Sequence, residues 1–294
     1  MSPWTAASLA SEGGPPHRMK RSPITRSTAL LSLAIAALVI ATAYAAVWAL
    51  RPAAVRLGSH RWVIGAEAKG RAGLSWLTVR IAAEVVILTA GAVVVVALAA
   101  VFVEILDAVT DAQDLTALDR AIIDWLASRR TPGLTRIQIA TTNLGSAVVL
   151  ITMVTLFAIV TARRLRSWYP VVLAVIGLGG SQTLVAVIKV AIARPRPDPP
   201  AQLVSATGYS FPSGHSASSL VGFGLLAWLV CLLTSNRTVW ATAWLAAALG
   251  TAAVGASRVY LGVHYPTDVL GGWALGLTWL AVVALAAQVW RMRA

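Results

Sequence analysis

Three short polar segments contain the residues best suited to chemistry, and each adjoins a long apolar stretch. The first runs over residues 189–197, the second over 209–215 and the third over 257–268. They contain lysine, arginine, serine, glycine, histidine and aspartate, the residue types that suit binding and transfer of a phosphoryl group. The sequence therefore points to phosphate chemistry at a site that the three segments share.

The cations and amides of these segments predict an anion site. A phosphoryl group carries dispersed negative charge, which arginine binds through two parallel N–H groups and lysine as a point charge. Lys189, Arg196 and Arg258 supply such charges. Ser213 and Gly214 precede an apolar stretch, so their backbone amides are expected at the positive end of a helix, where anions bind.

Two histidines predict opposite roles in the reaction. His264 and Asp268 are four residues apart, which on a helical turn places both on one face. The carboxylate would there fix the tautomer and orientation of the imidazole and prepare a nucleophilic nitrogen. His215 comes from a different segment and would be free to protonate the departing oxygen.

The composition places these segments in a membrane protein. Of the 294 residues 58% are hydrophobic and 12% are charged, which leaves too little polar surface for a water-soluble globule of this size. The formal charge of +13 would suit nucleic acid, but the basic residues form short clusters beside apolar stretches. Membrane topology and anionic headgroups explain them better, so we expect membrane lipids and no nucleic acid as partners.

Six apolar stretches are each long enough for a spanning helix, and they predict an all-α, polytopic membrane helix bundle. The stretches lie near residues 81–103, 144–162, 170–192, 216–234, 239–256 and 268–290. They define a six-helix domain over residues 81–292. Within it, Gly177, Gly179 and Gly180 are expected to permit close helix packing or a bend.

The residues ahead of this domain divide into three parts. Residues 1–27 are rich in serine, proline, glycine and charge, and predict a disordered basic tail. Residues 28–50 predict an extra N-terminal transmembrane helix, although their basic flank and small residues also fit a cleaved signal sequence. Residues 51–80 predict a basic cytoplasmic linker, because arginine and lysine accumulate in cytoplasmic loops.

The same rule sets the direction of the spans. With residues 51–80 inside, alternation places the basic loop 163–169 and Arg237 inside as well. The acidic segment 104–143, with a short amphipathic helix near 118–127, then lies outside, and so do all three polar segments. We therefore expect a multi-pass protein of the plasma membrane with an extracytoplasmic site.

The spacing of the polar residues resembles the three-part signature of the type 2 phosphatidic acid phosphatase superfamily. The matching residues, in the family's order and spacing, are Lys189 and Arg196-Pro197, then Pro212-Ser213-Gly214-His215, then Ser257-Arg258, His264 and Asp268. No departure occurs within the signature. The resemblance covers about residues 75–292 and leaves residues 1–74 outside it.

The resemblance implies a reaction and the roles of three residues. His264 would attack phosphorus and form a phosphohistidine, Asp268 would support His264, and His215 would be the general acid for the leaving group. Water would then hydrolyse the intermediate. The family requires neither metal nor another cofactor, so we expect none here.

The resemblance also implies which residues bind the phosphate. They are expected to be Lys189, Arg196, Ser213, Gly214 and Arg258. The spacing of the family signature selects Arg196 rather than Arg194, for which we expect a role in the loop or at a lipid headgroup.

The expected function is that of a lipid phosphate or lipid pyrophosphate phosphatase. Polyprenyl pyrophosphate is the preferred substrate, with phosphatidic acid and phosphatidylglycerophosphate as further candidates. One alternative is a lipid phosphotransferase that uses the same phosphohistidine, and another is a protein that binds or transports lipid phosphates without cleaving them. The sequence does not indicate an oligomeric state.

Overall fold

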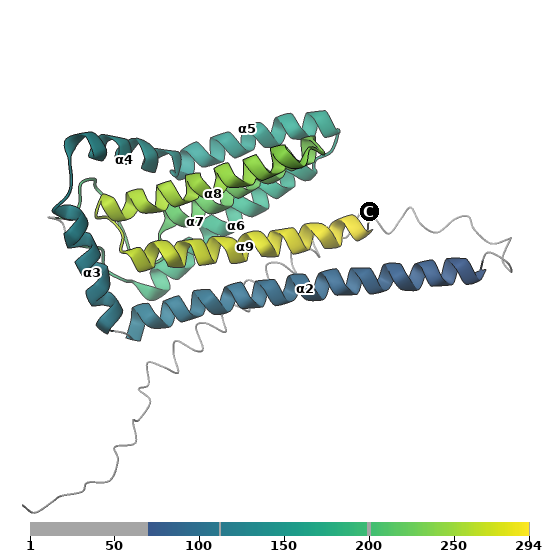
Figure 1. Ribbon diagram of the computed structural model, residues 1–294, viewed down its shortest axis with the longest axis horizontal. Coiled ribbons are helices and arrows are strands. Elements are labelled where there is room, and N and C mark those ends of the chain that lie inside the picture. The colour runs from purple at the N-terminus through teal and green to yellow at the C-terminus, as the bar shows by residue number, and fades with distance from the viewer. Residues whose placement is uncertain (1–69, 112, 199–200, 294) are drawn as a thin grey trace, which may run out of the picture.

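The computed structural model describes residues 70–111, 113–198 and 201–293, which form helices and loops without a strand. The expected tail, the extra N-terminal span and most of the expected linker lie outside these residues. The helices, shown in Figure 1, are α2 (Gly70–Asp111), α3 (Gln113–Ala127), α4 (Pro132–Leu144), α5 (Ala147–Leu165), α6 (Tyr169–Ile192), α7 (Gly214–Leu233), α8 (Arg237–Tyr260) and α9 (Pro266–Arg293).

Six of these helices contain a stretch long and apolar enough to cross a membrane, which confirms the predicted polytopic bundle. The stretches are Val86–Thr110 in α2, Ala147–Leu165, Tyr169–Ile192, Gly214–Leu233, Arg237–Tyr260 and Pro266–Trp290. One boundary differs from expectation, because α2 begins at Gly70, well before residue 81. The end of the expected linker, residues 70–80, is therefore helical.

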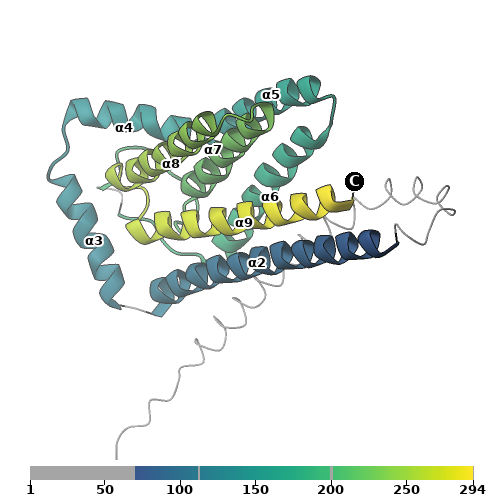
Figure 2. The ribbon, with the colours of Figure 1, turned by 45° about the vertical axis from the view of Figure 1, so that its right-hand side comes forward.

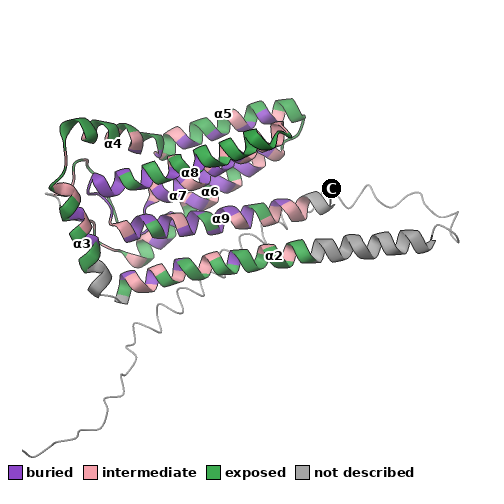
Figure 3. Cartoon of the chain, viewed as in Figure 1, coloured by how far each residue is buried: buried purple, intermediate pink, exposed green. Residues whose placement is uncertain are grey.

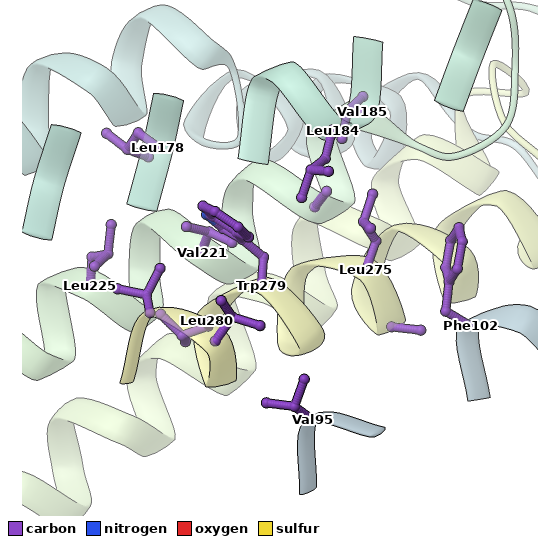
Figure 4. Packing of buried hydrophobic residues seen from close by; sticks show 14 of the residues in the cluster. Val95, Phe102, Leu178, Leu184, Val185, Val221, Leu225, Leu275, Trp279 and Leu280 are labelled. Atoms are coloured by element: carbon purple, nitrogen blue, oxygen red, sulfur yellow. The ribbon is translucent and has the colours of Figure 1, made fainter. Parts of the chain in front are cut away.

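Helix α7 lies at the centre of the bundle and packs against α5, α6, α8 and α9, while α2 runs alongside α9 (Figures 1 and 2). The main apolar core joins α2, α5, α6, α7 and α9, and Figure 4 shows part of it, with Trp279 of α9 beside Val221 of α7. Exposed residues follow the outer faces of α5 and α8 (Figure 3). They include Val148, Leu156 and Leu249, which suit contact with lipid tails.

Two contacts deep in the bundle hold α6 against α9. The indole Nε1 of Trp279 donates a hydrogen bond of 2.9 Å to the carbonyl of Gly177. A Cβ on Gly180 would lie 2.0 Å from the same indole, so this close approach requires glycine. Close packing is thus confirmed at Gly177 and Gly180, whereas a Cβ on Gly179 would have no described residue within 4 Å.

Helices α3 and α4 lie together at one end of the bundle, which we call the site end (Figure 1). Helix α3 confirms the short amphipathic helix expected near residues 118–127. Helix α4 was not predicted, although its start carries a standard signal. Thr131 caps it by accepting a hydrogen bond from the Leu134 amide, and Pro132 occupies its first turn.

The site end also collects the ends of four spanning helices, namely the last turns of α6 and α8 and the first turns of α7 and α9 (Figure 1). The loop between α8 and α9 turns tightly at Gly262, where φ is +70°. A Cβ there would lie 1.9 Å from the carbonyl oxygen of Ala201, so only glycine fits. The three polar segments of the sequence are thereby brought to one end of the molecule.

Candidate active site

A cavity of about 420 Å³ opens among these helix ends and contains most of the residues that the sequence singled out. Six of the eight predicted site residues line it: Lys189, Arg196, Gly214, His215, Arg258 and His264. They come from all three polar segments. The structure therefore brings together residues that are up to 75 positions apart in the chain, from 189 to 264.

His264 is oriented by a contact at each ring nitrogen. Its Nδ1 lies 3.4 Å from Oδ2 of Asp268, and its Nε2 lies 3.0 Å from Nη1 of Arg196. A guanidinium can only donate, so Nε2 must accept and the ring proton belongs on Nδ1, toward the carboxylate. This tautomer places an unshared electron pair on Nε2, which a nucleophile requires.

The protonation state of His264 favours the same role. Burial lowers the pKa of His264 to about 4, with Arg196 and Arg258 acting in the same direction and Asp268 opposing them. The imidazole is therefore neutral near pH 7. Since α9 begins at Pro266, His264 precedes the helix rather than lying on a helical turn as expected.

Asp268 is fully buried, and contacts to both of its oxygens hold the carboxylate in place. Oδ2 accepts hydrogen bonds from the hydroxyl of Ser210 and, at 2.9 Å, from the amide of Tyr265, besides its contact with His264. Oδ1 accepts from Nη1 of Arg194 at 2.6 Å. The carboxylate cannot rotate without breaking several of these bonds, so it fixes the imidazole.

The expected role of Arg194 in the loop or at a headgroup is wrong. Its guanidinium lies between two carboxylates, 2.6 Å from Asp268 and 2.8 Å from Asp119 of α3, and stacks 4.5 Å from the ring centre of Tyr265. Burial acts to lower the pKa of Arg194, but the two carboxylates outweigh it and raise the pKa. Arg194 is thus held inward by charge.

The cations in the cavity are held by oxygens without full negative charge. Arg196 donates to the backbone carbonyls of Thr207, Gly208 and Val263 at 2.7–3.0 Å. Lys189 donates to the carbonyl of Tyr209 at 2.5 Å. Because these carbonyls orient the side chains without neutralising them, their charge is available to an anion.

Arg258 is buried, and its one polar contact with the described residues is a hydrogen bond of 2.9 Å from its Nη1 to the hydroxyl of Thr142 in α4. Its Nε has no partner in the described part of the chain. None of the ion pairs among the described residues includes Arg258, Lys189 or Arg196. A buried guanidinium with an unused donor at a cavity wall is well suited to bind an oxyanion.

Ser213 differs from its expected place. It is fully buried and does not line the cavity, because its hydroxyl caps α7 by accepting from the amide of Ser216. Its own amide donates to the carbonyl of Asp268 at 2.9 Å, which ties the second polar segment to the third. Gly214 and His215 follow as the first residues of α7 and face the cavity, so the helix presents its positive end there.

Sequence reasoning missed four contributors. Thr142 and Asn143 line the cavity from α4, and Asp119 and Ser210 hold charged groups behind its wall. No motif marks these residues. The Thr-Pro start of α4 would have indicated a helix, but not that its far end reaches the site.

Known proteins are similar to this chain in sequence. The profile of the PAP2 superfamily matches residues 168–292, which include all three polar segments. Phosphatidylglycerophosphatase B of Bacillus subtilis strain 168 is 33% identical over 181 residues, 60% of this chain and 86% of that protein. An undecaprenyl-diphosphatase of Sulfolobus acidocaldarius is 40% identical over 79 residues, 27% of this chain and 34% of that protein.

The fold is shared as well. The crystal structure of a transmembrane PAP2-type phosphatidylglycerolphosphate phosphatase from Bacillus subtilis matches with a TM-score of 0.61 and 31% identity, covering 65% of this chain and 94% of that chain. These similarities confirm the resemblance seen in the motifs. The chain belongs to the PAP2 superfamily and is a membrane phosphatase, an enzyme that hydrolyses phosphate esters or anhydrides.

Proposed function

We propose that this protein hydrolyses a lipid phosphate or lipid pyrophosphate through a phosphohistidine on His264, at the extracytoplasmic face of the plasma membrane. The observation that carries the proposal is the position of Nε2 of His264. This atom has an unshared electron pair, lies 3.0 Å from Arg196, and belongs to a cavity that also contains Lys189 and Arg258. A phosphoryl group bound by the three cations would meet the nucleophile directly.

In the first step, Nε2 of His264 forms a bond to phosphorus while the bond from phosphorus to the leaving oxygen breaks. Nη1 of Arg196, which now faces Nε2, would donate to a phosphoryl oxygen instead. Asp268 accepts the Nδ1 proton in a hydrogen bond and stabilises the positive charge that develops on the ring. His215 enters this step as an imidazolium, a form that the negative charge of the bound phosphoryl group favours, and gives its proton to the departing oxygen.

In the second step, water attacks phosphorus and the phosphorus–nitrogen bond breaks, which returns the electron pair to Nε2 of His264. His215, neutral after the first step, accepts the proton of the water. The products are inorganic phosphate and either a lipid alcohol or, from a pyrophosphate, a lipid monophosphate. Lys189, Arg196, Arg258 and the amide end of α7 at Gly214 stabilise the transferred group, and Ser213 acts by capping that helix.

The extracytoplasmic location is supported by the charges at the two ends of the bundle. The last turn of α5 contains Arg163 and Arg164, and Arg166 caps it. Helix α8 begins at Arg237. Both of these helix ends lie opposite the site end (Figure 1). Short loops rich in arginine favour the cytoplasm. The site end would then face outward, where α3 carries charges of both signs.

A site at a helix end, beside apolar spans, suits a substrate whose phosphate lies at the membrane surface. Polyprenyl pyrophosphate remains the first candidate, since its recycling needs hydrolysis outside the membrane. The similarity to a phosphatidylglycerophosphatase over 86% of that protein supports phosphatidylglycerophosphate as the second candidate. The cations recognise the phosphate that both share.

The decisive experiment measures phosphate release from a panel of lipid phosphates by purified wild type and His264→Ala, with a chelator present. The wild type is expected to release free phosphate from at least one lipid of the panel. His264→Ala is expected to bind that lipid and release no phosphate. Rapid quenching with a labelled substrate should trap an acid-labile phosphoenzyme in the wild type alone.

Other outcomes would identify the alternative functions. Label passing to an added alcohol with little free phosphate would indicate a phosphotransferase. Lipid movement that persists in His264→Ala, without phosphate release by the wild type, would indicate a transporter. Phosphate release by His264→Ala at the wild-type rate would contradict the assignment of the nucleophile.

A further inference from the structure

Helix α3 crosses the site end with a buried carboxylate that belongs to neither the cavity nor the family signature. Asp119 is 2% exposed, whereas Asp124 on the same helix is exposed. Asp119 accepts hydrogen bonds from the amide of Thr267 at 3.1 Å, from its hydroxyl at 2.5 Å, and from Nη2 of Arg194 at 2.8 Å. A buried carboxylate with this many donors is held in a single position.

Arg194 links Asp119 to Asp268, which contacts the proposed nucleophile His264. One end of its guanidinium faces Asp119, and the other donates to Oδ1 of Asp268 at 2.6 Å. Asp268 in turn contacts Nδ1 of His264 through its other oxygen. A continuous series of charged contacts therefore runs from α3 to the imidazole, and neither Asp119 nor Arg194 lines the phosphate cavity.

The combined charge of Asp119, Arg194 and Asp268 explains why a second carboxylate is buried beside Arg194. An arginine paired with Asp268 alone would neutralise the carboxylate that must stabilise the ring when it becomes positive. With Asp119 on the other side of Arg194, two carboxylates share one guanidinium, and the trio keeps a net negative charge. Arg194 can then fix Asp268 in position without removing its electrostatic effect on His264.

We propose that Asp119 and Arg194 are positioning residues, which act on the reaction through Asp268 and make α3 part of the catalytic apparatus. The proposal rests on the proposed function, in which His264 is the nucleophile. It predicts that their replacement slows the chemical step and leaves phosphate binding nearly unchanged. Replacement of a cation in the cavity should instead weaken phosphate binding.

The first test compares Asp119→Asn with Asp124→Asn, the same change on an exposed position of the same helix. Asp119→Asn is expected to lower kcat about tenfold, while KM and the inhibition constant of inorganic phosphate stay within about twofold of wild type. Asp124→Asn should retain the wild-type kcat. A general loosening of the site end would weaken phosphate inhibition together with kcat, and that result would overturn the proposal.

The second test uses Arg194→Lys, which keeps the charge but cannot reach two carboxylates as a planar fork does. We expect a similar loss of kcat, and the double variant should lose little more than the worse single variant, because both changes break the same connection. Losses that multiply would show two independent roles and would contradict the proposal. Arg194→Lys also tests the connection alone if Asp119→Asn is not recovered folded.

The outcome is separable from that of the proposed function. If His264→Ala is inactive and Asp119→Asn has the wild-type kcat, the positioning proposal fails and the phosphohistidine proposal stands. If His264→Ala remains active, the nucleophile is wrong, and the loss in Asp119→Asn no longer supports a connection through Asp268.

Discussion

Nη1 of Arg196 lies 3.0 Å from Nε2 of His264, at the ring nitrogen that does not face Asp268. The same guanidinium is fixed by three backbone carbonyls, one of which belongs to Val263, the residue before the histidine. Hydrogen bonds between the α6–α7 loop and the α8–α9 loop therefore hold the proposed nucleophile and Arg196 next to each other. A phosphoryl group that binds Arg196 is at once close to the attacking nitrogen.

Arg196→Lys should separate charge from geometry at this position. Lysine keeps the positive charge but cannot reproduce the fork that meets the carbonyls and the substrate together. We expect kcat/KM to fall about tenfold to a hundredfold, with both a higher KM and a lower kcat. Steady-state kinetics would check this, and unchanged kinetics would mean that Arg196 contributes charge alone.

The pKa of His264, lowered by burial to about 4, predicts the acid limit of activity. Above this pH the imidazole is neutral and nucleophilic, and below it the proton occupies Nε2, so kcat/KM should fall about tenfold per pH unit below pH 4. Asp268 acts to raise this pKa, so Asp268→Asn should lower it further and move the acid limit to lower pH.

The ionisation of the substrate affects the pH profiles of the wild type and of Asp268→Asn equally. The difference between the wild-type and Asp268→Asn profiles of kcat/KM therefore reports on His264. An acid limit that moves to higher pH in Asp268→Asn would contradict the assigned interaction.

Thr142→Val tests how α4 contributes to the site. The change removes the hydroxyl that accepts from Nη1 of Arg258, which leaves a buried guanidinium without that partner. We expect KM to rise about tenfold or more, since a hydrogen bond to a charged group contributes about 1.5–3 kcal/mol. Thr142→Ser keeps the hydroxyl and should behave like wild type in the same kinetic assay.

Two neighbouring glycines offer a matched test of packing between α6 and α9. Gly180→Ala would place a methyl group 2.0 Å from the indole of Trp279, whereas the methyl group of Gly179→Ala would have no neighbour within 4 Å in the described part of the chain. We expect Gly180→Ala to cost about 1–3 kcal/mol of stability and Gly179→Ala to cost little. Thermal unfolding in detergent would compare them, and equal melting temperatures would show that the indole moves aside easily.

The six spans could be predicted because apolar length alone identifies them, and the family could be predicted because the residues of its signature occur at fixed spacings. Helix α4 could not be predicted in this way. It lies at the site end and mixes polar and apolar residues over one short stretch, so neither length nor period separates it from a loop. Thr142 was missed together with the helix that carries it.

Arg194 was misassigned for a different reason. Next to Pro195 in a basic loop it has the sequence features of a solvated residue, and its partner Asp119 is 75 positions away. An ion pair between two such segments depends on the docking of α3 over the start of α9, which the sequence pattern does not encode. Ser213 was placed in the right segment, but its hydroxyl is used by the helix that it starts.

The hydrogen bond from Trp279 to Gly177 has a mechanical consequence for the distant reaction. It joins α6 and α9 midway along their length. Lys189 lies in the last turn of α6, and Asp268 lies in the first turn of α9. A slide of one helix past the other by a single turn would displace these groups by about 5.4 Å. The hydrogen bond and the close fit of the indole oppose such a slide, so the relative position of Lys189 and Asp268 depends on a contact far from the site end.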